Sequence, residues 1–209
     1  MRHLATHHQG SVVNVAIVDN GGANMNSLVF ALQRLGVTPS LCSDIDALDA
    51  ASHIILPGVG HARDSMHRLQ KYALDDYIRD TKKPVLGICL GMQLFYHHSE
   101  EGATPCLDLV PGTVRKLVAT ERSPVPHMGW NQIHFRHVHP LLDNIETNSY
   151  MYFVHSYAAP VNEWTTGATQ YEQDLSAITI RDNFMGVQFH PERSGDNGAI
   201  LLSNFLKIS

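Results

Sequence analysis

Pro84-Val85-Leu86-Gly87-Ile88-Cys89-Leu90-Gly91 contains the pattern from which the expected fold follows. Residues 84–88 form a short apolar run, which predicts a buried strand, and residues 91–96 are expected to begin a helix. Cys89 stands in the G-x-nucleophile-x-G form of a strand-to-helix turn, where hydrolases often have serine. We expect the glycines to let the backbone turn sharply and the substrate come close. The amino end of the helix favours a thiolate, so the stretch predicts a reactive cysteine.

A second segment, Gln188-Phe189-His190-Pro191-Glu192, supplies the groups that a cysteine nucleophile needs. Alone, Cys89 would be a small buried apolar residue, and the His-Pro-Glu sequence would be an ordinary polar turn. Together they provide a nucleophile, a base and a carboxylate that orients the base. The apolar run 184–189 puts His190 at the end of a strand, where catalytic groups of α/β sheets gather. Cys89, His190 and Glu192 are therefore a predicted catalytic triad.

The composition is that of an ordinary globular protein. The chain has 209 residues, 44% hydrophobic and 17% charged, which suits one α/β domain. A net charge of -5 gives no basic footprint for nucleic acid, and no apolar run could span a membrane. The N-terminus lacks the apolar segment of a secretory signal. We expect a flexible extension over residues 1–12 and one domain over residues 13–209. Three cysteines are too few for a disulfide framework, which favours the reducing cytoplasm.

Apolar runs alternate with helical stripes along the chain. This pattern predicts an α/β fold with a flavodoxin-like, mainly parallel sheet flanked by helices, and an additional antiparallel portion. The expected strands are residues 13–18, 40–42, 53–56, 84–88, 113–117, 132–135, 151–154, 167–171, 177–180 and 184–189. The expected helices are residues 25–35, residues 61–81 with a break midway, residues 91–96 and residues 197–206.

The two motifs resemble those of class I, triad-type glutamine amidotransferases. Four further segments resemble the glutaminase subunits of imidazole glycerol phosphate synthase: Asp19-Asn20-Gly21-Gly22-Ala23-Asn24, Leu56-Pro57-Gly58-Val59-Gly60, Pro126-His127-Met128-Gly129-Trp130-Asn131 and Tyr152-Phe153-Val154-His155-Ser156-Tyr157. The likeness runs from about Val15 to Lys207, although Asn20 stands where the family more often has tyrosine. It implies hydrolysis of L-glutamine without a cofactor, and a heterodimer with a (β/α)₈-barrel cyclase subunit that receives the ammonia for histidine biosynthesis.

An oxyanion formed on the substrate needs N–H donors. The geometry of the turn makes the N–H of Leu90 one candidate. The second is expected from the loop Gly58-Val59-Gly60, and the resemblance implies a peptide flip at Val59 or Gly60 when the partner's ligand binds. The same loop could equally be a tight strand-to-helix turn.

The resemblance also implies which residues hold glutamine. Gln93 lies one helical turn after Cys89, so it can point into the same site. The implied substrate-binding residues are Gly58, Gln93, Glu101, and the backbone of His155, Ser156 and Tyr157. Glu101 could also be a solvated loop carboxylate, and His155 a structural residue.

Residues 126–131 have a different character, because Met and Trp beside turn-forming residues suggest a surface for a partner. Without the resemblance, a core tryptophan would be the simpler interpretation. The implied interface residues are Asn24, His127, Met128, Trp130 and Asn131. The chain has 14 histidines, yet none has cysteine or carboxylate partners at zinc-site spacing, so no metal is expected.

Three other classes of function remain open. Another amidotransferase branch, such as the anthranilate, carbamoyl phosphate or pyridoxal phosphate systems, would share both motifs but lack residues 126–131 as written. A stand-alone γ-glutamyl hydrolase or cysteine peptidase would need no partner. A binding-only regulator would have lost catalysis, which the intact triad residues argue against.

Overall fold

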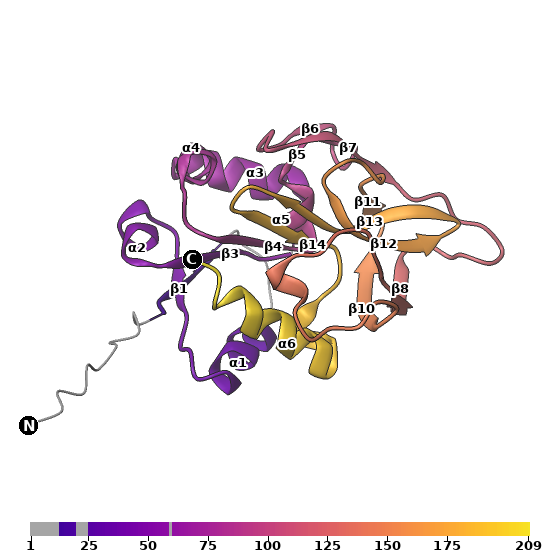
Figure 1. The fold of residues 1–209 in the computed structure, drawn as a ribbon. Helices are drawn as coiled ribbons and strands as arrows, with labels where there is room; N and C mark the ends of the chain where they lie inside the picture. Colours follow the sequence, from indigo (N-terminus) through magenta and orange to yellow (C-terminus); the bar gives the residue numbers. More distant parts are fainter. Residues whose placement is uncertain (1–12, 20–24, 59) are drawn as a thin grey trace, which may run out of the picture.

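The computed structural model describes residues 13–19, 25–58 and 60–209 (Figure 1). An eight-stranded sheet runs in the order β2-β1-β3-β4-β14-β13-β12-β9. The first five strands of that order are parallel: β2 (Ser40–Cys42), β1 (Val15–Val18), β3 (His53–Leu56), β4 (Val85–Ile88) and β14 (Phe184–Val187). The last three pair antiparallel: β13 (Gln173–Arg181), β12 (Thr165–Tyr171) and β9 (His134–Phe135). The predicted fold class is confirmed.

Alternation along the parallel strands builds a core on each face of the sheet. In β1, Ala16 and Val18 face one cluster, whereas Val15 and Ile17 face the other. The first cluster is covered by α2 (Ile45–Ala50), α3 (Ala62–Lys71) and α4 (Leu74–Asp80). The second is covered by α1 (Asn26–Arg34) and α6 (Gly195–Phe205), which lie together on the opposite side in Figure 1. Strands buried on both faces explain the continuous apolar runs.

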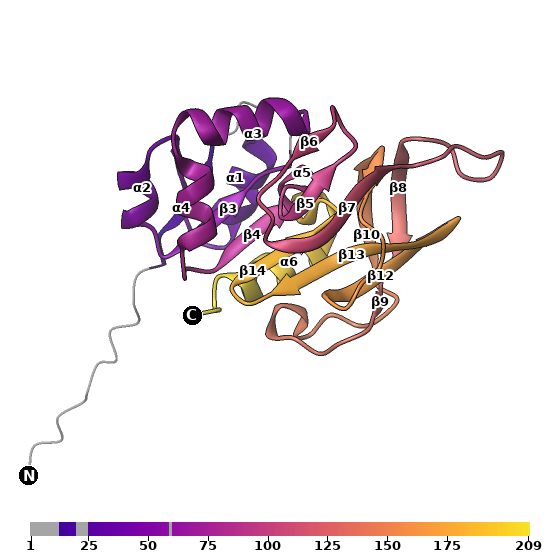
Figure 2. The ribbon, with the colours of Figure 1, turned by 90° about the horizontal axis from the view of Figure 1, so that it is seen from above.

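Two small sheets extend the molecule at the end away from α2 (Figure 2). One has four strands in the order β11-β7-β5-β6, namely β11 (Tyr157–Ala158), β7 (Val110–Lys116), β5 (Tyr96–Ser99) and β6 (Thr104–Pro105). The other pairs β8 (His127–Gln132) with β10 (Tyr150–His155) in antiparallel fashion. Short 3₁₀ turns, η1 (Pro140–Leu142) and η2 (Pro191–Arg193), complete the described elements.

Several expected elements have different bounds. The helix after Cys89, α5 (Leu90–Gln93), has only four residues, because Tyr96 begins β5 and its fully buried hydroxyl bonds with Thr179 Oγ1 at 2.6 Å. The helix predicted at residues 61–81 does break, at Ala73, whose φ is 54°. The strand expected at residues 132–135 was wrong, since residues 127–132 and 134–135 form two strands in different sheets. In the described part of the chain, no helix is long and apolar enough to cross a membrane.

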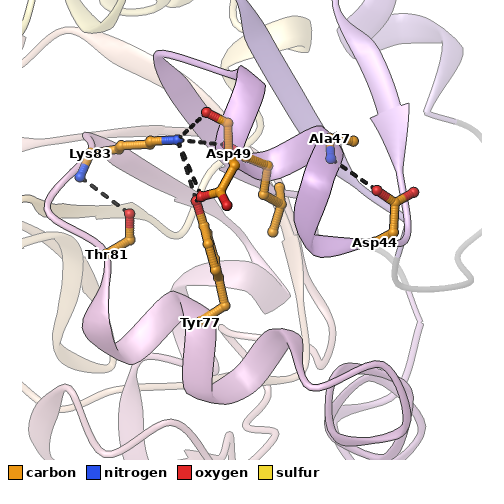
Figure 3. A network of polar contacts seen from close by, with 7 residues as sticks. Asp44, Ala47, Asp49, Tyr77, Thr81 and Lys83 are labelled. Atoms are coloured by element: carbon orange, nitrogen blue, oxygen red, sulfur yellow. Dashed lines mark hydrogen bonds and ion pairs between the residues drawn. The ribbon is translucent and has the colours of Figure 1, made fainter.

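Helix α2, which the sequence pattern did not predict, is fixed by polar contacts (Figure 3). At its start, the Asp44 carboxylate accepts a hydrogen bond from Ala47 N at 2.9 Å. At its end, Lys83 Nζ donates to the carbonyl oxygens of Leu48 and Asp49, both at 2.8 Å. Tyr77 of α4 donates to Asp49 Oδ1 at 2.7 Å. The segment before β4 thus ties α2 to α4.

Candidate active site

Cys89 occupies a strained turn between β4 and α5. Its φ of 50° and ψ of -106° are unusual for a residue with a side chain, and such a conformation costs on the order of 1–3 kcal/mol. Hydrogen bonds from Cys89 N to Val187 O (2.7 Å) and from Gln93 N to Cys89 O (3.2 Å) hold it. The nucleophile itself, and neither flanking glycine, takes the positive φ.

The glycines around Cys89 allow close packing, which corrects their expected role in turning the chain. A Cβ on Gly91 would lie 1.9 Å from Leu56 O, and one on Gly87 would lie 2.7 Å from the Gly91 carbonyl carbon. A Cβ on Gly58 would lie 2.5 Å from Cys89 Cβ. The loop after β3 therefore reaches the turn only because these positions lack side chains.

His190 and Glu192 follow β14, the neighbour of β4 in the sheet. His190 Nδ1 donates to Glu192 Oε1 at 2.8 Å, which leaves Nε2 for the cysteine. Burial lowers the pKa of His190, but its hydrogen bonds and charge interactions with Cys89 and Glu192 outweigh burial and raise the pKa to about 10. The His190 imidazole is therefore set to carry a proton at neutral pH.

The sulfur has two further polar neighbours. Gln188 Nε2 lies 3.6 Å from Cys89 Sγ, and the carbonyl oxygen of Val154 lies 3.7 Å away on β10. Gln188 is fully buried. The sequence motif includes Gln188, but its contact with the sulfur was not predicted. The available signal was an amide side chain inside an otherwise apolar run.

A cavity of about 290 Å³ opens at Cys89. All six predicted substrate-binding residues line it, together with Leu90 and Gly60 of the predicted oxyanion site: Gly58, Gln93, Glu101, His155, Ser156 and Tyr157. Gly60 has a φ of 109°, a conformation typical of glycine. Val59 lies outside the described residues. The volume is at the small end for ligand pockets, which suits an amino acid better than a peptide.

Gln93 and Glu101 are held firmly within this lining. Gln93 Nε2 donates to Tyr157 O at 2.8 Å and to Gln188 Oε1 at 3.0 Å. Glu101 Oε2 accepts from Ala62 N, at the start of α3, at 2.8 Å. Glu101 is therefore not a freely solvated loop carboxylate.

The predicted interface residues divide into surface and buried positions. Met128 and Trp130 are 62% and 55% exposed on β8, so the interpretation of a core tryptophan was wrong. His127 is only 3% exposed and stacks against Phe153 and Tyr171, because alternate residues of β8 point inward. The prediction that the His127 side chain contacts the partner is therefore corrected, because this side chain is buried. Asn131 is half-buried beside it, and Asn24 and Asn20 lie outside the described residues.

The histidines do not assemble into a metal site in the described residues, where no group of three or more His, Cys, Asp or Glu side chains could hold an ion. His139 lies close in sequence to His134 and His137. Its Nδ1 accepts a hydrogen bond from Leu141 N at 3.1 Å at the start of η1.

Comparison with known proteins identifies the family of the chain. The profile of the family "Glutamine amidotransferase class-I" matches residues 16–208. Imidazole glycerol phosphate synthase subunit HisH 2 of Legionella pneumophila strain Paris is 45% identical over 194 residues, covering 93% of this chain and 98% of the relative. Subunit HisH of Haemophilus influenzae is 46% identical over 196 residues, covering 94% and 98%. The solved structure of PurLQS from Thermotoga maritima shares the fold, with a TM-score of 0.69 at 17% identity over 93% of this chain and 98% of that one. The chain belongs to the class I glutamine amidotransferases and, among them, to the HisH family of imidazole glycerol phosphate synthase subunits.

Proposed function

We propose that this chain is the glutaminase subunit of an imidazole glycerol phosphate synthase, with residues 13–209 as its amidotransferase domain and residues 1–12 as an extension. It hydrolyses glutamine to glutamate and ammonia. The observation that carries the proposal is the strained Cys89, which lies beside His190 and opens into a small polar-lined cavity. His190 Nδ1 is in turn 2.8 Å from Glu192 Oε1. The likeness to HisH subunits over nearly the whole chain supports it further.

Acylation of the cysteine is the first half of the reaction. Cys89 as thiolate attacks the carboxamide carbon of glutamine, and the oxyanion is held by the N–H of Leu90 and one from Val59 or Gly60. The C–N bond breaks as protonated His190 gives its proton to the departing ammonia. Glu192 keeps the proton of the ring on Nδ1, so Nε2 faces the chemistry.

Deacylation returns the enzyme to its starting state. Neutral His190 takes a proton from water, which attacks the γ-glutamyl thioester. The C–S bond breaks, glutamate leaves, and the thiolate–imidazolium pair forms again. Gln93, Glu101 and the backbone of residues 155–157 hold the amino and carboxylate groups of the substrate. The protein's own groups and water balance this reaction, so it uses no cofactor.

The ammonia passes to a cyclase subunit with a (β/α)₈ barrel, which forms a heterodimer with this chain in the cytoplasm. That subunit makes imidazole glycerol phosphate and aminoimidazole carboxamide ribotide in histidine biosynthesis. Exposed Met128 and Trp130, beside Asn131 on β8, supply part of the docking surface, since exposed large apolar side chains are typical of interfaces.

A Cys89→Ala variant tests the proposal in the complex with the cyclase. We expect glutamine-dependent product formation to disappear, whereas product formation from added ammonium salts should persist. Cys42→Ala is the matched control, because Cys42 is also buried but lies on β2, away from the site. Glutamine-dependent turnover by the Cys89→Ala complex would overturn the assignment.

A further inference from the structure

We propose that Gln188 is a further functional residue of this site, one that donates an N–H to the Cys89 thiolate from an amide oriented by a buried hydrogen-bond chain. The inference rests on the proposed glutaminase function and adds a donor that the triad does not contain. Gln188 follows β14 and is fully buried, and its Nε2 lies 3.6 Å from Cys89 Sγ.

The orientation of the Gln188 amide follows from its neighbour. Gln93 Nε2 contacts Tyr157 O and Gln188 Oε1, at 2.8 and 3.0 Å. A backbone carbonyl can only accept, so Gln93 must present its nitrogen on this side. That nitrogen requires an oxygen from Gln188, and Gln188 is left with its N–H group toward the sulfur. Rotating either amide would place like groups together in a buried site.

A chain of buried side chains supports the same carbonyl from its other side. His155 Nδ1 donates to Tyr157 O at 2.8 Å, so Nε2 of neutral His155 accepts from His127 Nδ1 at 3.0 Å. His127 Nε2 then accepts from Asn131 Nδ2 at 3.3 Å. Each donor points the same way, from the β8 surface toward Tyr157.

This chain is set to stay neutral. Burial lowers the pKa of His127 to about 4, and burial together with its histidine neighbours lowers that of His155 to about 3. Each ring therefore keeps one tautomer at neutral pH. Asn131 is fixed in turn, since Nδ2 also donates to Gln170 O at 3.0 Å and Oδ1 accepts from Gln132 N at 2.8 Å.

The donor matters because the sulfur changes charge during turnover. As a thiol, Cys89 can donate to Val154 O at 3.7 Å, but a thiolate faces that oxygen without a proton between them. An N–H from Gln188 favours the charged sulfur without titrating itself. The titratable groups around the cavity and the sulfur are His190, Glu192, His155, Glu101 and Tyr157. Only His190 among them is a donor to the sulfur.

Gln188→Met tests the proposal, since methionine has a similar length and no N–H. The measurement is the pH dependence of Cys89 alkylation by iodoacetamide, followed on the peptide that contains Cys89, in the chain and in its complex with the cyclase. We expect the midpoint to rise by about one pH unit, and glutamate release near neutral pH to fall by about 10-fold. Burial raises the pKa of Cys42, and raises that of Cys106 to about 12, so both thiols react more slowly. Gln33→Met, on the exposed face of α1, should match the wild type.

An unchanged midpoint in folded Gln188→Met overturns the role of Gln188. If that variant does not fold, the wild-type chain decides: the side-chain amide protons of Gln188 should shift in NMR spectra with the midpoint of Cys89, and a constant shift overturns the proposal. Failure of the proposed function looks different. In that case wild-type Cys89 would titrate as an ordinary thiol, and the complex would release no glutamate.

Discussion

Two polar networks lie at opposite ends of strand β4. At its amino end, Lys83 joins α2 and α4 through carbonyl oxygens and the hydroxyl of Tyr77 (Figure 3). At its carboxyl end, Cys89 lies among amides and imidazoles. Lys83 and Asp49 keep side-chain exposures of 28% and 65%, whereas those of His190 and Glu192 are only 10%. The first network is open to solvent, whereas the second is almost completely buried.

The difference shows which network is built for stability and which for chemistry. Around Lys83, the carbonyl oxygens at the end of helix α2 accept hydrogen bonds, which the last turn of a helix needs from outside the helix. Around Cys89, the backbone has a positive φ, and Glu192 Oε2 is buried with no hydrogen-bond partner in the described residues. Such strain is typical of functional sites. Cavity size alone does not locate the chemistry, because a cavity of about 750 Å³ lies at the Lys83 end and its described lining contains no cysteine.

Loss of the orienting carboxylate should have the largest effect. Glu192→Gln should lower the rate of glutamate release by about 10³- to 10⁴-fold, because the amide can bind the wrong tautomer of His190. The measurement is steady-state glutamate release by the complex. Glu163→Gln, an exposed position, is the control and should retain wild-type activity. A loss of less than 10-fold would contradict the orienting role.

Packing at the turn should come next. Gly91→Ala would put a methyl group within 1.9 Å of Leu56 O, and we expect the free energy of unfolding to fall by about 3 kcal/mol. Gly36→Ala, where the added atom meets nothing within 4 Å, carries only the strain of its φ of 82° and should cost about 1 kcal/mol. Urea unfolding compares the two variants. Equal losses would mean that the close approach at Gly91 does not limit stability.

Acid should destabilise the Cys89 end through the buried histidines. His127 has a folded pKa of about 4, below the value of about 6.5 in an unfolded chain, so the unfolded state binds more protons between these values. The loss of unfolding free energy caused by keeping His127 neutral is absent above pH 6.5. It grows by about 1 kcal/mol per pH unit as the pH falls to about 4. His190 acts in the opposite sense, because its pKa is raised in the folded chain. Its contribution to the free energy of unfolding is complete below about pH 6.5 and is lost as the pH rises to about 10.

His127→Phe separates the first effect from the rest. The free energy of unfolding, measured by urea between pH 4.5 and 6.5, should fall about 1 kcal/mol less per pH unit in the variant than in the wild type. Parallel pH curves for the two proteins would show that His127 is not neutral in the folded chain.

The other network should affect stability without affecting activity. Lys83→Met removes the hydrogen bonds to α2 and should lower the free energy of unfolding by about 1–2 kcal/mol, with glutamate release per folded molecule unchanged. Thermal unfolding and a rate assay on the same sample check both parts. A large loss of activity without unfolding would show that the network at Lys83 also serves the chemistry at Cys89.

Strong patterns in the sequence predicted the central sheet. The runs before Cys89 and His190 are buried on both faces, so periodicity and motif agree there. The helix at residues 45–50 was not predicted, because contacts from Lys83 and Tyr77, far along the chain, stabilise it. Strand β5 was missed because Tyr96 is bound by Thr179, a contact that local sequence cannot reveal.

The candidate site was predictable where chemistry dictates residue type. A nucleophile, a base and a carboxylate could be named from two motifs, and the residues predicted to bind substrate all line one cavity. The burial of His127 and the contact of Gln188 with the sulfur depend on strand register and side-chain direction. These properties arise only when β8, β10 and β14 are placed together.

The decisive measurement is glutamate release from glutamine by the chain alone, with the cyclase subunit, and with the cyclase plus its ribonucleotide substrate. We expect little release by the chain alone and a large rise in the full complex, as follows if the oxyanion site is completed only when the partner's ligand binds. High release by the chain alone, unchanged by the partner, would contradict it and indicate a free hydrolase.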